Sequence, residues 1–429
     1  MSKNSAVPIY CAADDASDDV ALLDSSIAIM ALERILSVMK RVFLTVMALL
    51  SIAASAIAVG AVLGAFADPT SSLFAVLGSL VWATFGPFLF LTMLAACLTG
   101  FIMRWKGMRR LGGLIVALSL SGLIGAGFIL TRIGLAAVVA GGEINWLSSL
   151  MLGSMEEPVP DSVETIRVID GTELRAAIFL PPPDTAPAPV LVYIHGGGFM
   201  TGTFTETAAD LRWFADRGWL VISVEYRLFD PEHATWNKAP EDVQCALAWT
   251  FLNSPRLGGD PDRLALLGDS AGGNLAVNEG FRAAAGVTSS PCGPNVPVPM
   301  AIAVQYPAVD PISIYEHGFP IPGFEPRLLI EGYIGGSPEQ YPDRIAAVSS
   351  TSFLTPDAPP TLVILPENDS LVVASGTLTF VEDAEAAGVD IELVRIPFAN
   401  HVFNQMAANS LGNQIGRTVR LRFLEQRIR

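Results

Sequence analysis

The sequence predicts an α/β fold, in which a mostly parallel sheet carries helices on both faces and follows about three transmembrane helices. From residue 162 onward, short apolar runs typical of buried strands alternate with longer segments of helical character. Such alternation is the pattern of a parallel sheet covered on both sides. Before residue 140, three long stretches contain no charged residue, and each is long enough to cross a bilayer.

The membrane region is expected at residues 26–140. Uncharged stretches of more than about 18 residues favour membrane spans over buried core helices. A cleaved signal peptide would account for only one of the three stretches. Pro87 is a candidate kink within the second stretch. The predicted spans cover about 42–66, 74–103 and 111–131.

Basic residues predict how these spans are oriented. Lys40 and Arg41 precede the first span, and further basic residues lie at 104–110, between the second and third. The connection at 67–70 holds only the acidic Asp68. The positive-inside rule then places the N-terminus and residues 104–110 in the cytoplasm. We therefore expect a multi-pass protein of the inner (cytoplasmic) membrane in which the domain that follows the spans is extracytoplasmic.

The segments at the ends of the membrane region are less regular. Residues 1–25 are polar with an acidic cluster, and we expect a disordered tail there. Residues 141–160 are expected to be a linker or cap segment that joins the last span to the soluble domain. Arg132 leaves two interpretations open. It either reaches the outer interface from the end of the third span or, if that span covers 118–140, lies within the membrane and marks a functional site.

The α/β domain is expected at residues 161–429, and the motifs described next predict that it is catalytic. Its predicted strands are a hairpin over 166–180 and the runs 190–194, 220–224, 263–267, 300–305, 361–365 and 391–396. Its predicted helices cover 207–217, 239–252, 271–285, 375–387 and 404–426. The stretch 308–358 is rich in Pro, Gly and aromatic residues and interrupts the alternation. We expect an insertion there, with candidate pocket-lining residues Tyr315, Phe319, Phe324 and Tyr333; the family resemblance described below implies that it is a cap insertion.

Two short motifs lie at the ends of predicted strands. The sequence HGGGF stands at 195–199 and GDSAGG at 268–273, where it also opens a helix. This is the layout of the oxyanion loop and nucleophile elbow of an α/β-hydrolase. Ser270 is the candidate nucleophile, and glycines flank it because side chains there would collide with the neighbouring strand and helix. The N–H of Ala271 and those of the run 196–198 are expected to stabilise an oxyanion.

The serine hydroxyl needs a general base, for which His401 is the candidate. The order of the triad along an α/β-hydrolase chain is Ser, then Asp or Glu, then His. The chain has four histidines, of which His195 and His233 precede Ser270. His317 lies in a Pro- and Gly-rich stretch, whereas His401 comes just after the last predicted strand.

The acid of the triad should follow the preceding strand, 361–365. Glu367 and Asp369 both qualify by position, and we favour Asp369. A third carboxylate, Asp269, stands beside the nucleophile. It is better suited to bracing neighbouring loops through hydrogen bonds than to proton transfer.

These motifs resemble the hormone-sensitive-lipase-like bacterial esterases, also called the α/β-hydrolase fold-3 family. The resemblance covers about residues 160–425 and includes the two glycine motifs already described. The other motifs that carry the resemblance are Tyr226-Arg227-Leu228, Pro231-Glu232-His233, Glu241-Asp242-Val243, the strand entry Pro359-Pro360-Thr361-Leu362 and the acid motif Asp369-Ser370-Leu371.

The resemblance implies a carboxylesterase without a cofactor that acts mostly on short to medium acyl esters. It also implies that the amides of Gly197, Gly198 and Ala271 form the oxyanion hole, and that a cap covers the site. Phe229-Asp230 stand where the family usually has only Ala, and residues 400–403 read NHVF where it commonly has His-Gly-Phe. Both departures reshape the surroundings of the pocket and neither removes a catalytic group.

Composition excludes some classes of partner. Asp and Glu outnumber Lys and Arg by 42 to 26, for a net charge of −16, and an acidic domain without a basic stripe argues against nucleic acid. No spacing resembles a metal site and no glycine loop suits a dinucleotide. An outward-facing domain would permit a disulfide between Cys245 and Cys292, but we expect two independent cysteines.

The sequence therefore predicts a membrane-anchored serine carboxylesterase whose substrate is a small-molecule or lipid-like ester. One alternative keeps the catalytic groups but makes the protein an acyltransferase or deacetylase acting on envelope glycans or lipids. The other is a non-catalytic membrane sensor that uses the hydrolase fold. The complete Ser–Asp–His order argues against a sensor, whereas three spans, where one would anchor a domain, favour it.

Overall fold

The computed structural model describes residues 16–151, 158–169, 171–185, 187–288, 290–293 and 296–428, with side chains from Met30 onward. By its internal contacts the chain divides into two compact units. One is Met1–Ile57 with Thr92–Ser121, and the other is Ala58–Leu91 with Gly122–Arg429. Each unit is described by itself below. The first fifteen residues of the expected tail lie outside the described residues.

Apolar helices form the N-terminal part of the chain: α1 (Ala16–Ala65), α2 (Leu73–Leu80), α3 (Trp82–Trp105) and α4 (Arg109–Val139). Within the described residues, α1 from Met30 onward, α3 and α4 are each long and apolar enough to cross a membrane. In the first unit, Ala48 of α1 packs with Met103 and Ile115. A Cβ on Gly112 would lie 2.5 Å from the carbonyl oxygen of Gly100, so glycine lets α3 and α4 approach closely there.

The helix boundaries differ in detail from the expected spans. The backbone of 16–25, which we expected to be disordered, forms the start of α1. The second expected span is divided at Val81 into α2 and α3, and Pro87 lies inside α3. Helix α4 continues eight residues beyond the expected end at 131, so Arg132 lies within it, with an exposed side chain.

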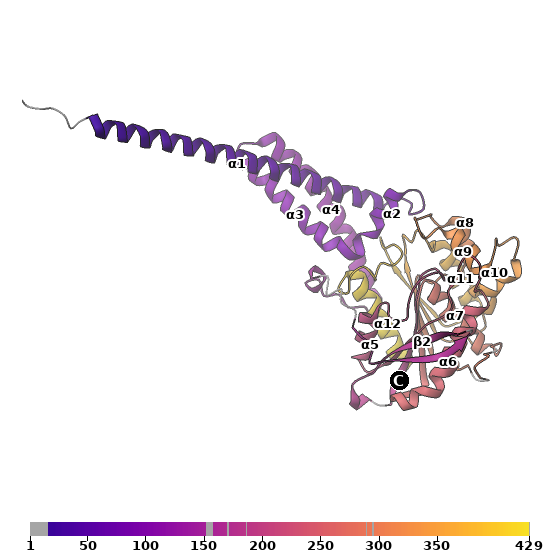
Figure 1. The fold of residues 1–429 in the computed structure, drawn as a ribbon. Coiled ribbons are helices and arrows are strands. Elements are labelled where there is room, and N and C mark those ends of the chain that lie inside the picture. Colours follow the sequence, from indigo (N-terminus) through magenta and orange to yellow (C-terminus); the bar gives the residue numbers. More distant parts are fainter. Residues whose placement is uncertain are drawn as a thin grey trace, which may run out of the picture. The chain divides into compact units, whose positions relative to one another are not determined.

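The described residues of the second unit form one eight-stranded sheet in the order β1-β2-β4-β3-β5-β6-β7-β8 (Figure 1). Strands β1 and β2 form the expected hairpin, and β2 also pairs antiparallel with β4, whereas all other neighbours are parallel. The strands are β1 (Ser162–Ile169), β2 (Thr172–Phe179), β3 (Ala188–Ile194), β4 (Leu220–Val224), β5 (Gly259–Asp269), β6 (Ala301–Gln305), β7 (Thr361–Pro366) and β8 (Ile391–Ile396).

Helices cover both faces of this sheet, as a parallel α/β sheet requires. Figure 1 shows α5 (Ala208–Ala215) and α12 (Leu411–Arg427) on one side, and α6 (Lys238–Asn253), α7 (Ala271–Ala284) and α11 (Ala374–Ala386) on the other. Helix α12 begins later than the expected 404 because Ser410 caps it, accepting a hydrogen bond from the N–H of Asn413.

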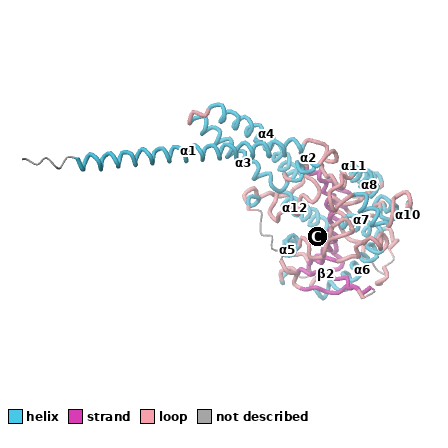
Figure 2. Tube along the Cα trace, turned by 45° about the horizontal axis from the view of Figure 1, so that its top comes forward, coloured by secondary structure: helices cyan, strands magenta, loops and turns pink. Residues whose placement is uncertain are grey.

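The expected cap insertion at 308–358 contains three short helices that cluster beside α7 and α11 (Figure 2). They are α8 (Pro311–His317), α9 (Pro326–Ile334) and α10 (Pro342–Val348). The linker that precedes the sheet packs on α12, where Thr418 and Gln414 accept hydrogen bonds from the N–H groups of Glu143 and Asn145. Residues 152–157 of that linker lie outside the described residues.

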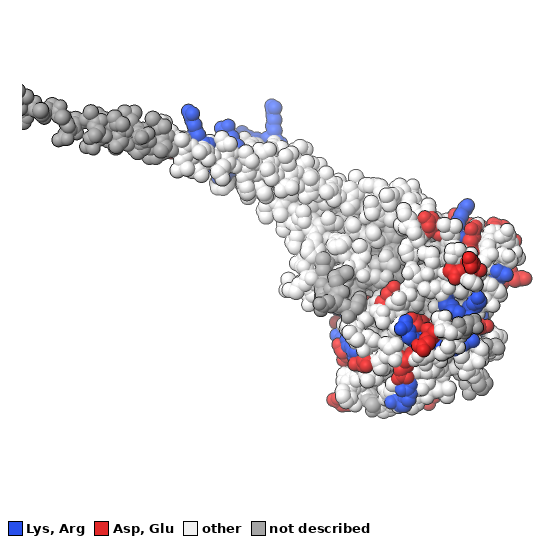
Figure 3. All heavy atoms as spheres, in the orientation of Figure 1, with Lys and Arg blue, Asp and Glu red and all other residues white. Residues whose placement is uncertain are grey.

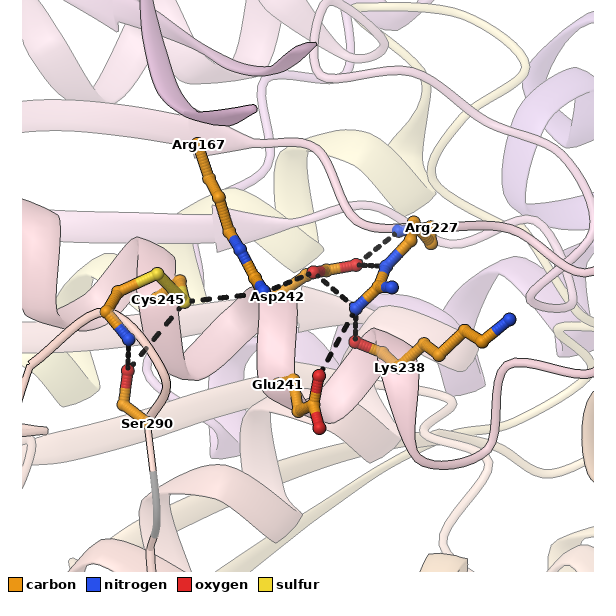
Figure 4. Close-up of a disulfide and its surroundings, with 8 residues drawn as sticks. Arg167, Arg227, Lys238, Glu241, Asp242, Cys245 and Ser290 are labelled. Carbon is orange, nitrogen blue, oxygen red and sulfur yellow. Dashed lines mark hydrogen bonds and ion pairs between the residues drawn. A yellow bond between two sulfur atoms is a disulfide. The ribbon is translucent and has the colours of Figure 1, made fainter. Parts of the chain in front are cut away.

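Cys245 and Cys292 form a disulfide, which corrects the expectation of two independent cysteines. Cys245 is buried in α6 and Cys292 lies in an exposed loop, 47 residues further along the chain. Sequence spacing alone cannot reveal this pairing, because a cysteine on a helix and one in a distant loop come together only through the tertiary fold. Figure 4 shows Cys245 next to Asp242 and the side chain of Arg167, which reaches it from β1.

Charged side chains are distributed unevenly over the surface. Figure 3 shows Lys, Arg, Asp and Glu intermingled over the sheet-containing part, whereas the visible surface of the long helices is mostly uncharged. Large apolar side chains of these helices are exposed, among them Phe43, Leu63 and Phe101. A water-soluble protein rarely exposes apolar surface on this scale, which fits helices whose surroundings are lipid.

Candidate active site

Ser270 occupies a sharp turn between β5 and α7. Its φ of 56° and ψ of −119° lie outside the regions that side chains ordinarily favour. A Cβ on Gly268 would lie 2.4 Å from the carbonyl oxygen of Gly272, and a Cβ on Gly272 would lie 2.1 Å from that of Ile194. Both positions therefore require glycine, for the steric reason that the motif predicts.

His401 and Asp369 lie beside this turn in the order of a catalytic triad. The Nε2 atom of His401 is 3.0 Å from the Ser270 Oγ, and its Nδ1 is 2.7 Å from Asp369 Oδ2. A carboxylate can only accept, so Nδ1 carries the proton and Nε2 is free to accept the serine proton. Asp369 is buried, and its Oδ1 accepts from the N–H groups of Leu371 and Val372 at 3.0 and 2.8 Å.

The other candidates for acid and base lie elsewhere. Glu367 forms an ion pair with Arg395 in a partly exposed position. His195 is buried beside Tyr226, with ring centroids 4.4 Å apart, and His233 contacts the carboxylate of Asp230 at the surface. His317 ends the cap helix α8 and is exposed. Among the four histidines, the structure places His401 against the serine.

Asp269 braces the elbow, as expected for this carboxylate. Its Oδ1 accepts from Arg420 of α12 at 3.1 Å and from Gln305 of β6 at 3.2 Å. Its Oδ2 accepts from the hydroxyl of Tyr193 at 3.3 Å. The residue next to the nucleophile is thus tied to two strands and a helix, which fixes the position of Ser270 in a strained turn.

The glycine run also borders the serine. Gly196, Gly197, Gly198 and Ser270 line one cavity. Gly197 and Gly198 have φ values of 105° and 62°, and a Cβ on Gly197 would lie 2.0 Å from the carbonyl oxygen of Thr201. Ala271 is the first residue of α7, and the N–H groups of a helix's first turn have no intrahelical partner. The three predicted donors therefore belong to two segments next to Ser270. Gly197 and Gly198 belong to the glycine run, and Ala271 belongs to the start of α7.

The carbonyl of Gly196 is held in place by neighbouring side chains. The Tyr226 hydroxyl donates to the carbonyl oxygens of His195 and Gly196 at 2.9 and 3.3 Å, and His195 Nδ1 lies 2.8 Å from the latter. Burial lowers the pKa of His195 to about 4, so the ring is neutral at pH 7. Because a carbonyl oxygen can only accept, the proton of this neutral ring is on Nδ1, which donates to Gly196. In the sequence, Tyr226 is recognisable only as part of the motif Tyr226-Arg227-Leu228, which carries no signal of this role.

The remaining motif residues form a structural network beside the disulfide (Figure 4). Asp242 accepts from the Nε and Nη2 atoms of Arg227 at 2.7 and 2.9 Å, and lies 3.4 Å from Arg167 Nη1. Burial raises the pKa of Asp242, and the hydrogen bonds from Arg227 oppose that change. These residues connect β1, the end of β4 and α6, and they do not line the cavity at Ser270.

The cavity at Ser270 has a volume of about 460 Å³, within the usual range for small-molecule sites. Of the four aromatic residues predicted to line it, Phe324 does so. Tyr333 is buried and stacks on Phe199 with centroids 3.7 Å apart, and Tyr315 donates to Glu331. The backbone N–H of Phe319 donates a hydrogen bond to the carbonyl oxygen of Ser370. In the described part of the chain, no three His, Cys, Asp or Glu side chains are placed to hold a metal ion.

Comparisons with known proteins agree with this architecture. Residues 177–383 match the protein-family model described as BD-FAE. Esterase LipC of Mycobacterium tuberculosis is 29% identical over 232 residues, which are 51% of this chain and 54% of LipC. Human hormone-sensitive lipase is 35% identical over 151 residues, which are 34% of this chain and 13% of that protein. The chain spans about half the length of the first curated relatives that it matches.

Among solved structures, the propionate-bound esterase Est2 of Thermogutta terrifontis aligns with a TM-score of 0.52 at 21% identity, covering 63% of this chain and 95% of that one. At this identity the likeness bears on the fold, and together with the sheet order it shows the α/β-hydrolase fold. The chain is similar in sequence to esterases that include human hormone-sensitive lipase, and three apolar helices precede the similar region in the sequence.

Proposed function

We propose that this protein is a membrane-anchored serine carboxylesterase that hydrolyses short- to medium-chain acyl esters. The observation that carries the proposal is the chain of contacts from Asp369 through His401 to the Ser270 Oγ, at 2.7 and 3.0 Å. The names of its relatives, which include esterases and carboxylic ester hydrolases, support the same reaction class.

The geometry suits acyl transfer through a covalent intermediate. Ser270 Oγ attacks the ester carbonyl while His401 Nε2 takes its proton, and Asp369 stabilises the imidazolium that forms. The amides of Gly197, Gly198 and Ala271 stabilise the negative charge on the carbonyl oxygen, which is commonly the largest single contribution. His401 then returns the proton to the leaving alcohol. A water molecule, activated by the same histidine, releases the carboxylic acid and restores the serine.

The membrane placement that we propose has the catalytic domain on the extracytoplasmic side of the inner membrane. Basic residues at the end of α3, in the connection that follows and at the start of α4 support this orientation, since such residues favour the cytoplasmic side. The disulfide between Cys245 and Cys292 supports it independently, because disulfides persist in oxidising compartments.

Esterase activity is tested with p-nitrophenyl esters of increasing chain length and detergent-solubilised protein. We expect turnover by the wild type that Ser270→Ala abolishes. An Ile312→Ala variant, which changes an exposed residue of the cap helix α8, serves as the control for handling and should remain active. Folded wild-type protein that turns over no ester in the series would contradict the proposal.

Orientation is tested by labelling introduced cysteines in intact cells with a maleimide that cannot cross the membrane. The exposed positions Asp357 and Arg109 belong to the hydrolase domain and to the start of α4. We expect labelling of Asp357→Cys and none of Arg109→Cys above the background of the unchanged protein. The reverse pattern would place the catalytic domain in the cytoplasm.

A further inference from the structure

Two residues of the short helix α2 line the cavity that contains Ser270. Val76 is 4% exposed and Leu80 is partly exposed, and both border this cavity. The cavity's other apolar or aromatic lining comes from Tyr306, Ile321, Phe324, Leu371 and Val402. Helix α2 lies between α1 and α3 in the sequence, far from the hydrolase motifs. The apolar N-terminal region therefore supplies part of the wall of the catalytic cavity.

A single amide side chain connects α2 to both loops that carry the candidate acid and base. The Asn400 Nδ2 donates to the Ser79 Oγ at 2.8 Å. Its Oδ1 accepts from the N–H of Ser370 at 3.0 Å and from the N–H of His401. Asn400 and Ser79 are both buried, and buried hydrogen bonds of this kind fix the relative position of the groups they join. Helix α2 is thus held in a defined position beside His401.

The end of α1 makes a second set of contacts in the same unit. Asn368, next to the candidate acid, donates from Nδ2 to the carbonyl oxygen of Ala65 at 3.1 Å. A Cβ on Gly78 of α2 would lie 2.5 Å from the backbone of Gly64, so the two helix backbones touch through glycines. The position of α2 therefore depends on α1 as well as on the catalytic loops.

The two faces of α2 are both apolar but have different surroundings. Val76 and Leu80 border the cavity, whereas Leu73, Phe74 and Leu77 are 55%, 53% and 52% exposed. A helix between two candidate membrane spans that exposes three large apolar side chains is suited to contact with lipid. The same short helix therefore contributes to the apolar wall of the cavity and to an exposed surface that favours acyl chains.

We propose that Val76 and Leu80 are specificity-determining residues, and that the substrate is a membrane-partitioning ester whose acyl chain lies against α2. This inference rests on the proposed esterase function and names the substrate class of the same site. The ester carbonyl lies between Ser270 and the glycine run, and the acyl chain extends along the apolar wall. Longer chains gain contact with that wall, so selectivity rises with chain length until the cavity is filled.

The test compares kcat/KM for p-nitrophenyl octanoate and p-nitrophenyl acetate. We expect the wild type to prefer the octanoate. Leu80→Trp fills the cavity beside α2 and should lower the octanoate-to-acetate ratio by about tenfold or more, the usual effect of changing pocket volume by a methylene or more. Leu77→Trp places the same ring at an exposed position of the same helix that does not line the cavity, and should keep the wild-type ratio within about twofold.

Leu80→Ala extends the test if the tryptophan variant fails to fold, which thermal unfolding reports. It widens the cavity and should move the preferred chain length upward. A wild-type enzyme that prefers acetate, or Leu80 variants whose chain-length profile equals that of Leu77→Trp, would overturn the inference while leaving the esterase proposal intact. A wild-type protein without turnover on either ester would instead contradict the proposed function itself.

Discussion

Arg420 and Asp269 form a buried ion pair directly behind the candidate nucleophile. Their Nη1 and Oδ1 atoms are 3.1 Å apart, and the two side chains are 3% and 1% exposed. Arg420 belongs to α12 near the end of the chain, whereas Asp269 precedes Ser270. The C-terminal helix therefore positions the elbow at the centre of the sheet through one charged contact.

Removing Arg420 should destabilise the fold strongly. Arg420→Met leaves the Asp269 carboxylate buried without its charged partner, and breaking such a pair costs about 3–5 kcal/mol. Arg427→Met is the matched control, since the ion pair of Arg427 with Asp390 lies at the surface and such pairs contribute about 1 kcal/mol or less. Thermal unfolding in detergent measures both variants. Equal melting temperatures for the two would show that the buried pair is dispensable.

A side chain at Gly197 should disable catalysis without unfolding the protein. In Gly197→Ala the added Cβ collides with the carbonyl of Thr201, which displaces an amide expected to stabilise the oxyanion. Loss of one such donor costs about 10²–10³-fold in kcat. Gly171→Ala also places alanine at a positive φ, but no atom lies within 4 Å of its Cβ. We expect near wild-type kcat for this control, measured on the preferred ester.

Reduction of the disulfide should lower stability. The bridge closes a segment with a sequence separation of 47 residues, for which loop-closure entropy gives a contribution of about 4 kcal/mol or less. Cys292→Ala removes the bridge at its exposed end and leaves the buried Cys245 in place. We expect its melting temperature to equal that of reduced wild-type protein and to be insensitive to dithiothreitol. A wild-type melting temperature unchanged by reductant would contradict this role.

Glu279 should make stability depend on pH. Burial raises its pKa from 4.5 to about 7, opposed by Arg282 and by a hydrogen bond from Gln244. The folded state favours the protonated form of Glu279. The contribution of Glu279 to the free energy of unfolding is therefore fully present below about pH 4.5 and is lost as the pH rises through 7. The free energy of unfolding changes by roughly 3 kcal/mol over this range.

The substitution Glu279→Gln tests that dependence, because an amide is neutral at every pH. We expect the melting temperature of the variant relative to wild type to increase between pH 5 and pH 8. The exposed Glu382→Gln should show no such trend. A difference between Glu279→Gln and wild type that stays constant across this range would contradict the assigned protonation of Glu279.

The sheet and the proximity of the three candidate triad residues were predictable because their signals are local. Strands β3 and β5 are apolar runs that end in glycine motifs, and the steric demands at Gly268 and Gly272 leave a signature readable in one segment. Ser270, Asp369 and His401 follow β5, β7 and β8, and they lie close together because the carboxyl ends of parallel strands meet at one edge of the sheet. Local pattern and global fold agree at these positions.

Contacts between distant segments could not be predicted in the same way. The bond from Asn400 to Ser79 joins residues 321 positions apart, and neither side chain has a sequence pattern that points to the other. The break at Val81, which turns one apolar stretch into α2 and α3, is hidden because the residues on both sides of it are apolar. Pairing of Cys245 with Cys292 was missed for a related reason, since it depends on how a loop folds back onto α6.

The most direct test of the account is covalent labelling of the nucleophile. An alkyl fluorophosphonate is incubated with the full-length protein in detergent, and the labelled residue is located by peptide mass spectrometry. We predict one phosphonyl group on Ser270, no labelling of Ser270→Ala, and labelling of His401→Ala slowed by a factor of about 10³ or more. Folded wild-type protein that remains unlabelled, or that is labelled at another residue, would contradict the assignment of Ser270 as the catalytic serine.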